Sequence, residues 1–398
     1  MLEKSETDVA QTLKTFNSYQ LDVALLVPTP TGLSKSIMDA TGPVRTYLME
    51  NGVHDFERQG QGQENKVVLS ALFVGSKGFE ETSVSLYRPE TKRGDPRIWF
   101  SGLGKYAEPF NLLAVLFLSG KIYLVNCSRN DVMRSIGDPN SPLGRLAGSA
   151  ESVSSGPAEE LLSKLKEVSG KGFIKTLRPG PTGVGMTLET ELGIAANSSR
   201  APDFRGIELK AGRVGKRSKT RTTLFSKVPA WKLSPVGSAM GLLEKRGRVI
   251  DERLQLYHEL NGVSPNSYGL LLQIDTAPDW LKQVHVESVT GQVTHDTTWE
   301  MPKLRKALAD KHRETFWVEA ETVGSGENEA FHYVLAKHTV GPRIRNFDAL
   351  LECGIITLDY TMHQKSSGGV RDHGYLFKIH PDNISALFPP PRLYALAA

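Results

Sequence analysis

The sequence has 398 residues, enough for two or three domains, and its content of 39% hydrophobic and 23% charged residues is ordinary for a globular protein. A net charge of +4 permits a polyanionic partner without requiring one. The longest apolar run, Leu112–Leu118, is too short to cross a bilayer, and the N-terminus has no signal-peptide pattern, so we expect a cytoplasmic protein without a membrane partner. The two cysteines, Cys127 and Cys353, give neither a disulfide framework nor a thiolate metal cage.

The first 136 residues contain several predicted strands. Short apolar and aromatic runs, separated by Gly and Pro, are typical of strands. These runs are Val67–Val74, Thr82–Tyr87, Arg97–Phe100 and Lys121–Val125. We therefore predict a β-rich domain over residues 1–136.

The composition changes in the next segment. Residues Gly137–Pro157, GDPNSPLGRLAGSAESVSSGP, are dominated by Gly, Pro and Ser and have no apolar period. Such a composition favours a flexible, solvated linker. The domain boundary is therefore predicted at residues 137–157, with a second domain over residues 158–398.

The second domain mixes helical and strand patterns. Helical spacing of apolar residues predicts helices at Ala158–Val168, Leu242–Leu260 and Met301–Lys311. Strands are predicted at Gly206–Lys210, Tyr268–Ile274, Thr315–Ala320, Phe331–Lys337 and Tyr375–Ile379. These elements predict a mixed α/β (α+β) domain.

The most informative motif closes the stretch GVGMTLETELGIAANSSRAPDFRGIELK, residues 183–210. Asp203 is followed by four residues and then by Glu208-Leu209-Lys210. In a strand, side chains two residues apart share a face and lie about 6.6 Å apart along the chain. Glu208 and Lys210 are thus expected side by side, and Asp203, at the start of the strand, can reach the same space.

Phosphodiester hydrolysis uses this set of groups. Hard oxygen ligands hold Mg²⁺, which neutralises phosphate charge and lowers the pKa of a bound water. Asp203 and Glu208 would supply ligands, with the backbone carbonyl of Leu209 as a third. Lys210 would orient or deprotonate the attacking water, or stabilise charge on the phosphate.

The Glu-x-Lys triplet on its own is weak evidence. It recurs at residues 64–66 and 90–92, where an exposed strand or turn is the simpler interpretation. Pro-Asp followed closely by a strand that carries Glu-x-Lys occurs only once in the chain. The interpretation therefore depends on the surrounding residues.

Those residues resemble the MvaI/BcnI type of restriction endonuclease, relatives of the mismatch-repair nicking enzyme MutH. The resemblance lies in GVGMTLETELGI, in the Asn-Ser and Pro-Asp elements and in GIELK. It continues into TTLFSKVPAW, Thr222–Trp231, and returns at RDHGYLFKI, Arg371–Ile379. It covers most of residues 158–390, with the motifs in the same order.

The resemblance implies a MutH-like PD-(D/E)XK nuclease domain with Mg²⁺ as cofactor and double-stranded DNA as partner. Its catalytic residues would be Asp203, Glu208 and Lys210, with a further family glutamate at Glu189. Without the resemblance, Glu189 is a first-turn helix carboxylate favoured by the helix dipole. Family members act as monomers that nick one strand and then the other, although one catalytic set per chain also fits a dimer.

A basic segment follows directly on the predicted catalytic strand. It has no acidic residue, and its cations are Arg213, Lys216, Arg217, Lys219 and Arg221. A solvated loop is an equally simple interpretation. Its position favours contacts with phosphates near the scissile bond, which add salt-dependent affinity but no sequence choice.

Three neighbouring residues offer groups for base edges: Arg371, Asp372 and His373. Arg can bind guanine O6 and N7, and Asp can accept from cytosine N4. Alone, they would indicate a surface turn closed by an Arg–Asp pair. The resemblance favours recognition, because the family's recognition loops include this region, and it implies a short G·C-rich site of the CC-x-GG kind. His363 and Lys365, on the same predicted loop, are weaker candidates.

In the first domain, four cations surround a Gly-Pro turn within SLYRPETKRGDPRIWF: Arg88, Lys92, Arg93 and Arg97. A solvated hairpin is the simpler interpretation. The pattern also resembles the B3-like effector-binding domains of EcoRII-type restriction enzymes. A B3-like pseudobarrel of this kind would bind a second copy of the recognition site and stimulate cleavage, as in a type IIE enzyme.

Other functions stay open at this point. A MutH-like nicking enzyme would share the catalytic set but leave one strand intact, and a DNA-binding protein could carry an inert nuclease fold. A nuclease acting on RNA is disfavoured by the family resemblance and by the lack of an evident aromatic stacking platform. The sequence thus predicts a Mg²⁺-dependent, sequence-specific type II deoxyribonuclease.

Overall fold

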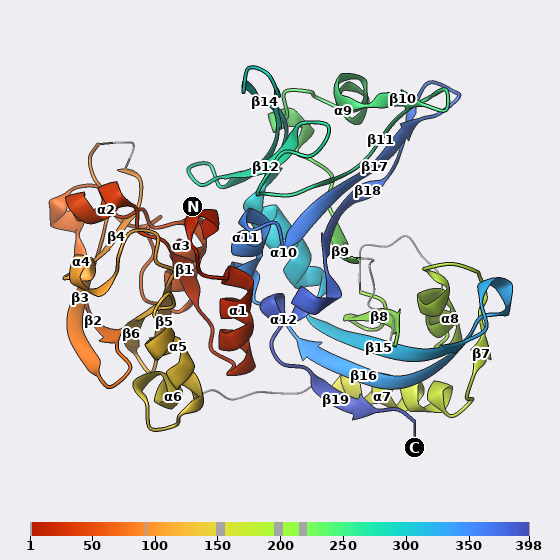
Figure 1. Cartoon of the computed structure of the whole chain (residues 1–398), viewed down its shortest axis with the longest axis horizontal. Helices are drawn as coiled ribbons and strands as arrows, with labels where there is room; N and C mark the ends of the chain where they lie inside the picture. The colour runs from red at the N-terminus through yellow and green to blue at the C-terminus, as the bar shows by residue number, and fades with distance from the viewer. Residues whose placement is uncertain (1, 92–93, 149–155, 195–201, 215–220, 398) are drawn as a thin grey trace.

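The computed structural model describes the chain except residues 1, 92–93, 149–155, 195–201, 215–220 and 398. The described part contains four β-sheets and the helices that pack on them (Figure 1). One sheet belongs to the N-terminal region, and three belong to the region after residue 155. No helix in the described ranges is long and apolar enough to cross a membrane.

The N-terminal region is built on a six-stranded sheet with the order β1-β5-β6-β2-β3-β4, in which β2 and β6 pair parallel and the other neighbours pair antiparallel. The strands are β1 (Ala24–Leu26), β2 (Val67–Val74), β3 (Phe79–Tyr87), β4 (Arg97–Phe100), β5 (Leu113–Leu118) and β6 (Lys121–Asn126). The helices are α1 (Val9–Ser18), α2 (Pro30–Lys35), α3 (Gly42–Glu50), α4 (Leu103–Tyr106), α5 (Asn130–Arg134) and α6 (Pro142–Ala147).

The strands predicted in this region are confirmed, with β3 starting three residues earlier and β6 ending one residue later than expected. The prediction missed β5, whose first four residues are all buried. A strand covered on both faces has no alternation between apolar and polar residues. The prediction also missed the helices, so the region is mixed, and its B3-like character stays a prediction.

The predicted linker is wrong for its first half. Pro142 starts α6, and the Ser141 hydroxyl caps the helix by accepting the N–H of Gly144 at 2.9 Å. Leu143 and Leu146 are buried in the core. Residues 137–148 therefore belong to the folded N-terminal region, and residues 149–155 lie outside the described part.

The sheet that carries the Glu-x-Lys motif, hereafter the β8 sheet, has the order β19-β16-β15-β8, with β7 paired to β16. Its strands are β7 (Ile174–Lys175), β8 (Ile207–Arg213), β15 (Glu314–Val323), β16 (Ala330–Val340) and β19 (Arg392–Ala395). β8 and β15 run parallel. Two helices, α7 (Gly156–Ser169) and α8 (Gly183–Glu191), share an apolar core with these strands.

The remaining two sheets are antiparallel. The projecting sheet has the order β10-β11-β17-β18-β9, and its long strands extend away from the β8 sheet (Figure 1). Its strands are β9 (Thr222–Ser226), β10 (Arg248–Ile250), β11 (Arg253–Leu260), β17 (Ile356–Gln364) and β18 (Val370–Ile379). The three-stranded sheet contains β12 (Leu270–Asp275), β13 (Trp280–Val286) and β14 (Val293–Glu300). The helices are α9 (Ala239–Arg246), α10 (Met301–Lys311), α11 (Ile344–Glu352) and α12 (Ile384–Leu387).

The helix predicted over Leu242–Leu260 is wrong beyond Arg246. Residues 248–260 form the β10–β11 hairpin, whose two turn residues, Asp251 and Glu252, both have positive φ (48° and 61°). Two successive left-handed residues form the tight turn that suits a two-residue hairpin. The buried Leu256 and Leu260 are four residues apart, a spacing that fits both a helix face and one side of a strand.

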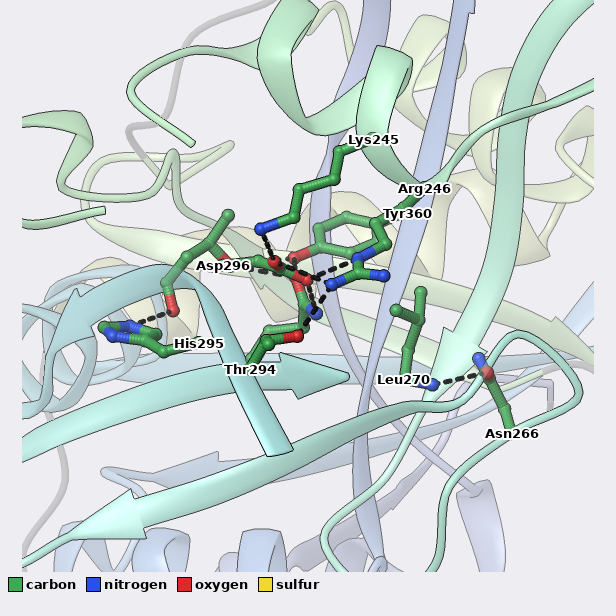
Figure 2. A network of polar contacts seen from close by, with 10 residues as sticks. Lys245, Arg246, Asn266, Leu270, Thr294, His295, Asp296 and Tyr360 are labelled. Carbon is green, nitrogen blue, oxygen red and sulfur yellow. Dashed lines mark hydrogen bonds and ion pairs between the residues drawn. The ribbon is translucent and has the colours of Figure 1, made fainter. Parts of the chain in front are cut away.

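A buried polar network joins the three-stranded sheet to α9 and to the projecting sheet (Figure 2). Asp296 is fully buried and accepts from Arg246 Nε at 2.8 Å, from Gln283 Nε2 at 2.8 Å and from Lys245 Nζ at 2.9 Å. The Tyr360 hydroxyl on β17 donates to Gln283 Oε1 at 3.2 Å. Burial alone would raise the pKa of Asp296, but these hydrogen bonds outweigh it and lower the pKa.

The N-terminal region packs directly against the C-terminal region. α1 contacts α12, and α3 contacts α11. Arg345 on α11 pairs with Asp22 and with Glu50, and its guanidinium lies 4.5 Å from the ring centroid of Tyr47. The two regions therefore share a continuous apolar core.

Candidate active site

A two-residue turn brings Asp203 back onto β8. Phe204 and Ile207 exchange backbone hydrogen bonds of 2.9 and 2.8 Å, and the residues between them, Arg205 and Gly206, have φ of 46° and 91°. The turn folds Asp203 alongside β8, where its Oδ2 accepts the N–H of Leu209 at 2.9 Å. The four residues between Asp203 and Glu208 thus correspond to one tight turn.

Glu208 lies between two lysines. Lys210 Nζ contacts Glu208 Oε1 at 2.5 Å, and Lys311 Nζ contacts Oε2 at 2.8 Å. Glu208 is only 1% exposed, so each ammonium compensates a carboxylate oxygen that has little access to water. Lys210 keeps 29% of its side chain exposed. Asp203, Glu208 and the two lysines form a cluster of charged side chains, hereafter the pocket.

Sequence reasoning missed Lys311. It is the last residue of α10 and lies 101 positions after Lys210 along the chain. A lysine at the end of a predicted helix is ordinarily explained by the helix dipole, so the sequence carried no signal that Lys311 would contact Glu208. The parallel pairing of β8 with β15, which starts three residues after Lys311, brings the two lysines together.

The carboxyl groups of the pocket influence one another. Burial, and then repulsion from Glu208, raise the pKa of Asp203. Burial, and then repulsion from Asp203, raise the pKa of the half-buried Glu189. Glu189 lies in the last turn of α8, so its interpretation as a first-turn carboxylate is wrong. Lys210 and Lys311 oppose both shifts. The predicted residues Glu189, Asp203, Glu208 and Lys210 are therefore in one electrostatic neighbourhood.

A model of the MvaI/BcnI restriction endonuclease family matches residues 162–388. The chain belongs to the MvaI/BcnI restriction endonuclease family. This membership implies a DNA-hydrolysing enzyme. The matched range contains the pocket formed by Asp203, Glu208, Lys210 and Lys311.

Two solved structures are similar to this family member. Restriction endonuclease MvaI in complex with its cognate DNA substrate superposes with a TM-score of 0.53 at 22% identity, covering 62% of this chain and 100% of that one. MvaI in the absence of DNA gives a TM-score of 0.41, with the same identity and coverage. At this identity the first likeness supports the fold alone. Among curated proteins, none matches the chain.

The basic segment after β8 is only partly described. Lys216, Arg217 and Lys219 lie outside the described residues. Arg213 forms two 2.7 Å contacts with the Glu329 carboxylate and also donates to the carbonyls of residues 180 and 181. In this arrangement the Arg213 guanidinium anchors the loop before α8.

Arg221, the last cation of the segment, is also paired. It contacts Asp359 at 2.8 Å and Glu259 at 3.0 Å on the projecting sheet. Asp359 binds Lys378 as well, at 2.8 Å. These contacts occupy the Arg221 guanidinium at the base of the projecting sheet, where it stabilises the strand arrangement.

Except for Lys365, which lies in the loop as predicted, the recognition candidates lie on strands near the end of the β17–β18 hairpin. Their register separates the three neighbours. Arg371 pairs with His363, whereas Asp372 pairs with the buried Met362, and directly paired residues share a face. His373, two residues after Arg371 on the same strand, returns to the face of His363, and the ring centroids of the two histidines are 5.6 Å apart.

The face that carries Arg371 and His363 includes a neighbour that the sequence did not indicate. Tyr257 on β11 contacts His363 Nδ1 through its hydroxyl at 2.7 Å. Arg371 and His373 are exposed, and so is Lys365 beyond the end of β17. This polar face, defined by Tyr257, His363, Arg371 and His373, lies at the exposed end of the hairpin.

The cations predicted to bind effector DNA are less available than the sequence suggested. Lys92 and Arg93 lie outside the described residues. Arg88 donates to the backbone carbonyls of residues 56, 59 and 94, and so holds two loops together. Arg97 is only 8% exposed and pairs with Asp39 at 3.4 Å. The two described cations therefore have structural roles.

Proposed function

We propose that this family member is a Mg²⁺-dependent type II restriction endonuclease that cuts double-stranded DNA at a specific site. The observation that carries the proposal is the pocket beside β8, where Asp203 lies next to Glu208 and Glu208 contacts both Lys210 and Lys311. Membership of a restriction endonuclease family supports the class of reaction.

The pocket fits a divalent cation with oxygen ligands. Repulsion between Asp203 and Glu208 contributes to the raised pKa of Asp203, and a bound cation would relieve it. Asp203 uses Oδ2 for the Leu209 N–H, and among the described contacts Oδ1 accepts no hydrogen bond. Within the described ranges no three His, Cys, Asp or Glu side chains form a metal cage. The proposed ligands are therefore Asp203, Glu208, the Leu209 carbonyl and water.

When bound there, Mg²⁺ would neutralise phosphate charge and lower the pKa of its water. The protein groups would position the substrate around that centre. Lys210, partly exposed, can turn from Glu208 to a phosphate oxygen or to the attacking water. While Lys210 moves, the Lys311 ammonium would stay in contact with the Glu208 carboxylate. Glu189, with its raised pKa, can hold a proton near the pocket.

For sequence recognition we propose the polar face at the end of the projecting sheet. Arg371 offers a guanidinium for guanine, while His363 and His373 offer imidazole nitrogens. Asp372, on the opposite face, would contact DNA only from the other side of the hairpin. The proposed target is a short G·C-rich site of the CC-x-GG kind.

We also propose that the N-terminal region binds a second copy of this site, as in a type IIE enzyme. Its six-stranded sheet lies outside the residues matched by the family model, and its helices pack on α11 and α12. A ligand bound there could therefore influence the C-terminal region. Addition of a cognate oligonucleotide should stimulate cleavage of a plasmid with one site, and a scrambled oligonucleotide should not. Equal rates with both would contradict this assignment.

Digestion of a supercoiled plasmid with Mg²⁺ tests the main proposal. We expect linear product with ends at discrete positions, passing through a nicked intermediate if the enzyme acts as a monomer. Nicked circles that persist would favour a MutH-like nicking enzyme. Binding without any cleavage would favour a DNA-binding protein. Sequencing the fragment ends gives the recognised bases and the cut position together.

A further inference from the structure

His312 fixes the end of α10 beside the pocket. It follows Lys311 directly, is fully buried, and uses both ring nitrogens: Nε2 with the Leu224 carbonyl and Nδ1 with the Thr315 hydroxyl, each at 2.9 Å. A carbonyl only accepts, so Nε2 carries the proton and Nδ1 accepts from Thr315. Burial, aided by Lys210, lowers the pKa of His312 to about 3, which keeps the ring neutral.

These bonds connect α10 to the strand that faces the catalytic residues. Thr315 on β15 pairs in register with Glu208, and Trp317 pairs with Lys210. The ring of His312 therefore ties the end of α10 to the position opposite Glu208. This connection places Lys311 Nζ 2.8 Å from Glu208 Oε2.

Phe388 supports His312 from the other side. It follows α12, is 1% exposed, and packs edge-on against His312 and against Trp317, with ring centroids 5.3 Å apart in both pairs. A cavity at Phe388, or a shift of its ring, would therefore displace both His312 and Trp317, since closely packed interiors transmit strain.

The N-terminal region holds α12 in place. Asn17 on α1 is 2% exposed, and its Nδ2 donates to the carbonyls of Ser385 at 2.9 Å and Ala386 at 3.0 Å. Asn346 donates to the Ala386 carbonyl as well, at 2.8 Å. Loss of Asn17 would remove both of these bonds and leave the buried Ala386 carbonyl with the Asn346 donor alone, which weakens the attachment of α12 to α1.

We propose that the N-terminal region is a positioning element of the active site, with Asn17 acting through α12, Phe388 and His312 on the contact between Lys311 and Glu208. The inference rests on the proposed function, because it assigns Lys311 to the cleavage reaction. None of these intermediate residues touches substrate. Their effect is on the position of the Lys311 ammonium relative to Glu208.

The test measures single-turnover cleavage by the full chain, with enzyme in excess over a cognate duplex. Asn17→Ala should slow cleavage by roughly two- to thirtyfold, the range seen for residues within coupled networks. Phe388→Leu, which keeps most of the apolar volume, should act in the same direction. Affinity for the duplex should be unchanged in both variants. Glu50→Gln is the matched control, since it weakens the same interface at α11 instead of α12.

A double-mutant cycle decides whether the effect passes through Lys311. Asn17→Ala should have no further effect once Lys311 is replaced by Ala. Three outcomes would each overturn the proposal. The rate losses of Asn17→Ala and Lys311→Ala could multiply in the double variant, a folded Asn17→Ala variant could cleave at the wild-type rate, or Glu50→Gln could slow cleavage as much as Asn17→Ala does.

Hydrogen exchange of peptides spanning residues 306–316 provides a readout that does not depend on activity. Asn17→Ala and Phe388→Leu should increase exchange there, and Glu50→Gln should not. If the wild-type chain cleaves no DNA, the proposed function fails. The exchange pattern still decides whether the N-terminal region holds the end of α10, and unchanged exchange in both variants would overturn that part.

Discussion

On the β8 sheet, the charged groups of the pocket lie partly under the surface and contact one another, whereas at the end of the projecting sheet they are exposed. Glu208 is 1% exposed and is held by two lysines. Arg371 and His373 lie in the open, on strands whose base is fixed by the pairing of Arg221 with Asp359. Charge interactions are strong where water is scarce and weak where it is abundant. The first region is thus suited to chemistry, and the second to contact with a partner.

The contrast between the two regions would be contradicted most clearly if substitutions in the pocket left DNA cleavage unchanged. Asp203→Ala and Lys210→Ala should each lower cleavage by about 10²–10³-fold or more, because each removes a preorganised charge from the reacting centre. Duplex affinity should persist. Cleavage and gel-shift assays on the same preparations test this. The matched control is Arg205→Ala. Arg205 lies between Asp203 and Lys210 in the sequence, but its side chain is exposed and pairs with Glu160.

The buried Asp296 network should contribute more to the free energy of unfolding than an exposed ion pair does. Asp296→Ala should cost about 3–5 kcal/mol in unfolding free energy, because Arg246 would lose a buried partner. Urea unfolding measures the loss. Asp131→Ala, which breaks an exposed pair with Arg129, should cost at most about 1 kcal/mol. Similar losses in both variants would mean that the network does not hold the projecting sheet in place.

The raised pKa values of Asp203 and Glu189 predict a pH dependence confined to the pocket. Mg²⁺ binds the ionised carboxylate of Asp203, so cleavage at limiting Mg²⁺ should fall as pH drops through the raised pKa of that group, by about tenfold per pH unit. Added Mg²⁺ should move the fall to lower pH. A profile that does not respond to Mg²⁺ concentration would contradict this assignment.

Stability should change in the opposite direction without Mg²⁺. The folded pKa values of these two carboxyl groups lie above their unfolded values, so the folded state binds more protons in that window. The free energy of unfolding should therefore rise as pH falls through the raised values, since protonation removes the cost of burying these charges and then the repulsion between carboxylates. Thermal unfolding with and without Mg²⁺ measures the contribution, and Asp203→Asn should reduce it.

The smallest expected effect distinguishes the two faces of the projecting hairpin. Arg371→Ala should lower cognate affinity by about 1–3 kcal/mol with little change for a scrambled duplex. Asp372→Ala should change the preference less, because Asp372 pairs with Met362 on the opposite face. Competition binding at fixed salt tests both variants. A larger loss for Asp372→Ala would place the DNA on the other side of the hairpin.

The sequence by itself determined the local chemistry of the pocket. Asp203, Glu208 and Lys210 lie within eight residues, so one turn and one strand suffice to gather them. The helix at Met301–Lys311 was also predictable, because its apolar period is regular and its partner strands follow directly. The hairpin at residues 248–260 was not, because its leucines fit two periods and the choice depends on pairing with β17.

Only the tertiary structure decided which distant residues join the site. Lys311 meets Glu208 because β15 pairs with β8, and the pairing of β17 with β18 places Arg371 opposite His363 and Asp372 opposite Met362. α6 formed inside a Gly- and Ser-rich segment because Leu143 is buried against the core. Strand pairing, register and burial arise between segments far apart in the chain, and local composition carries no record of them.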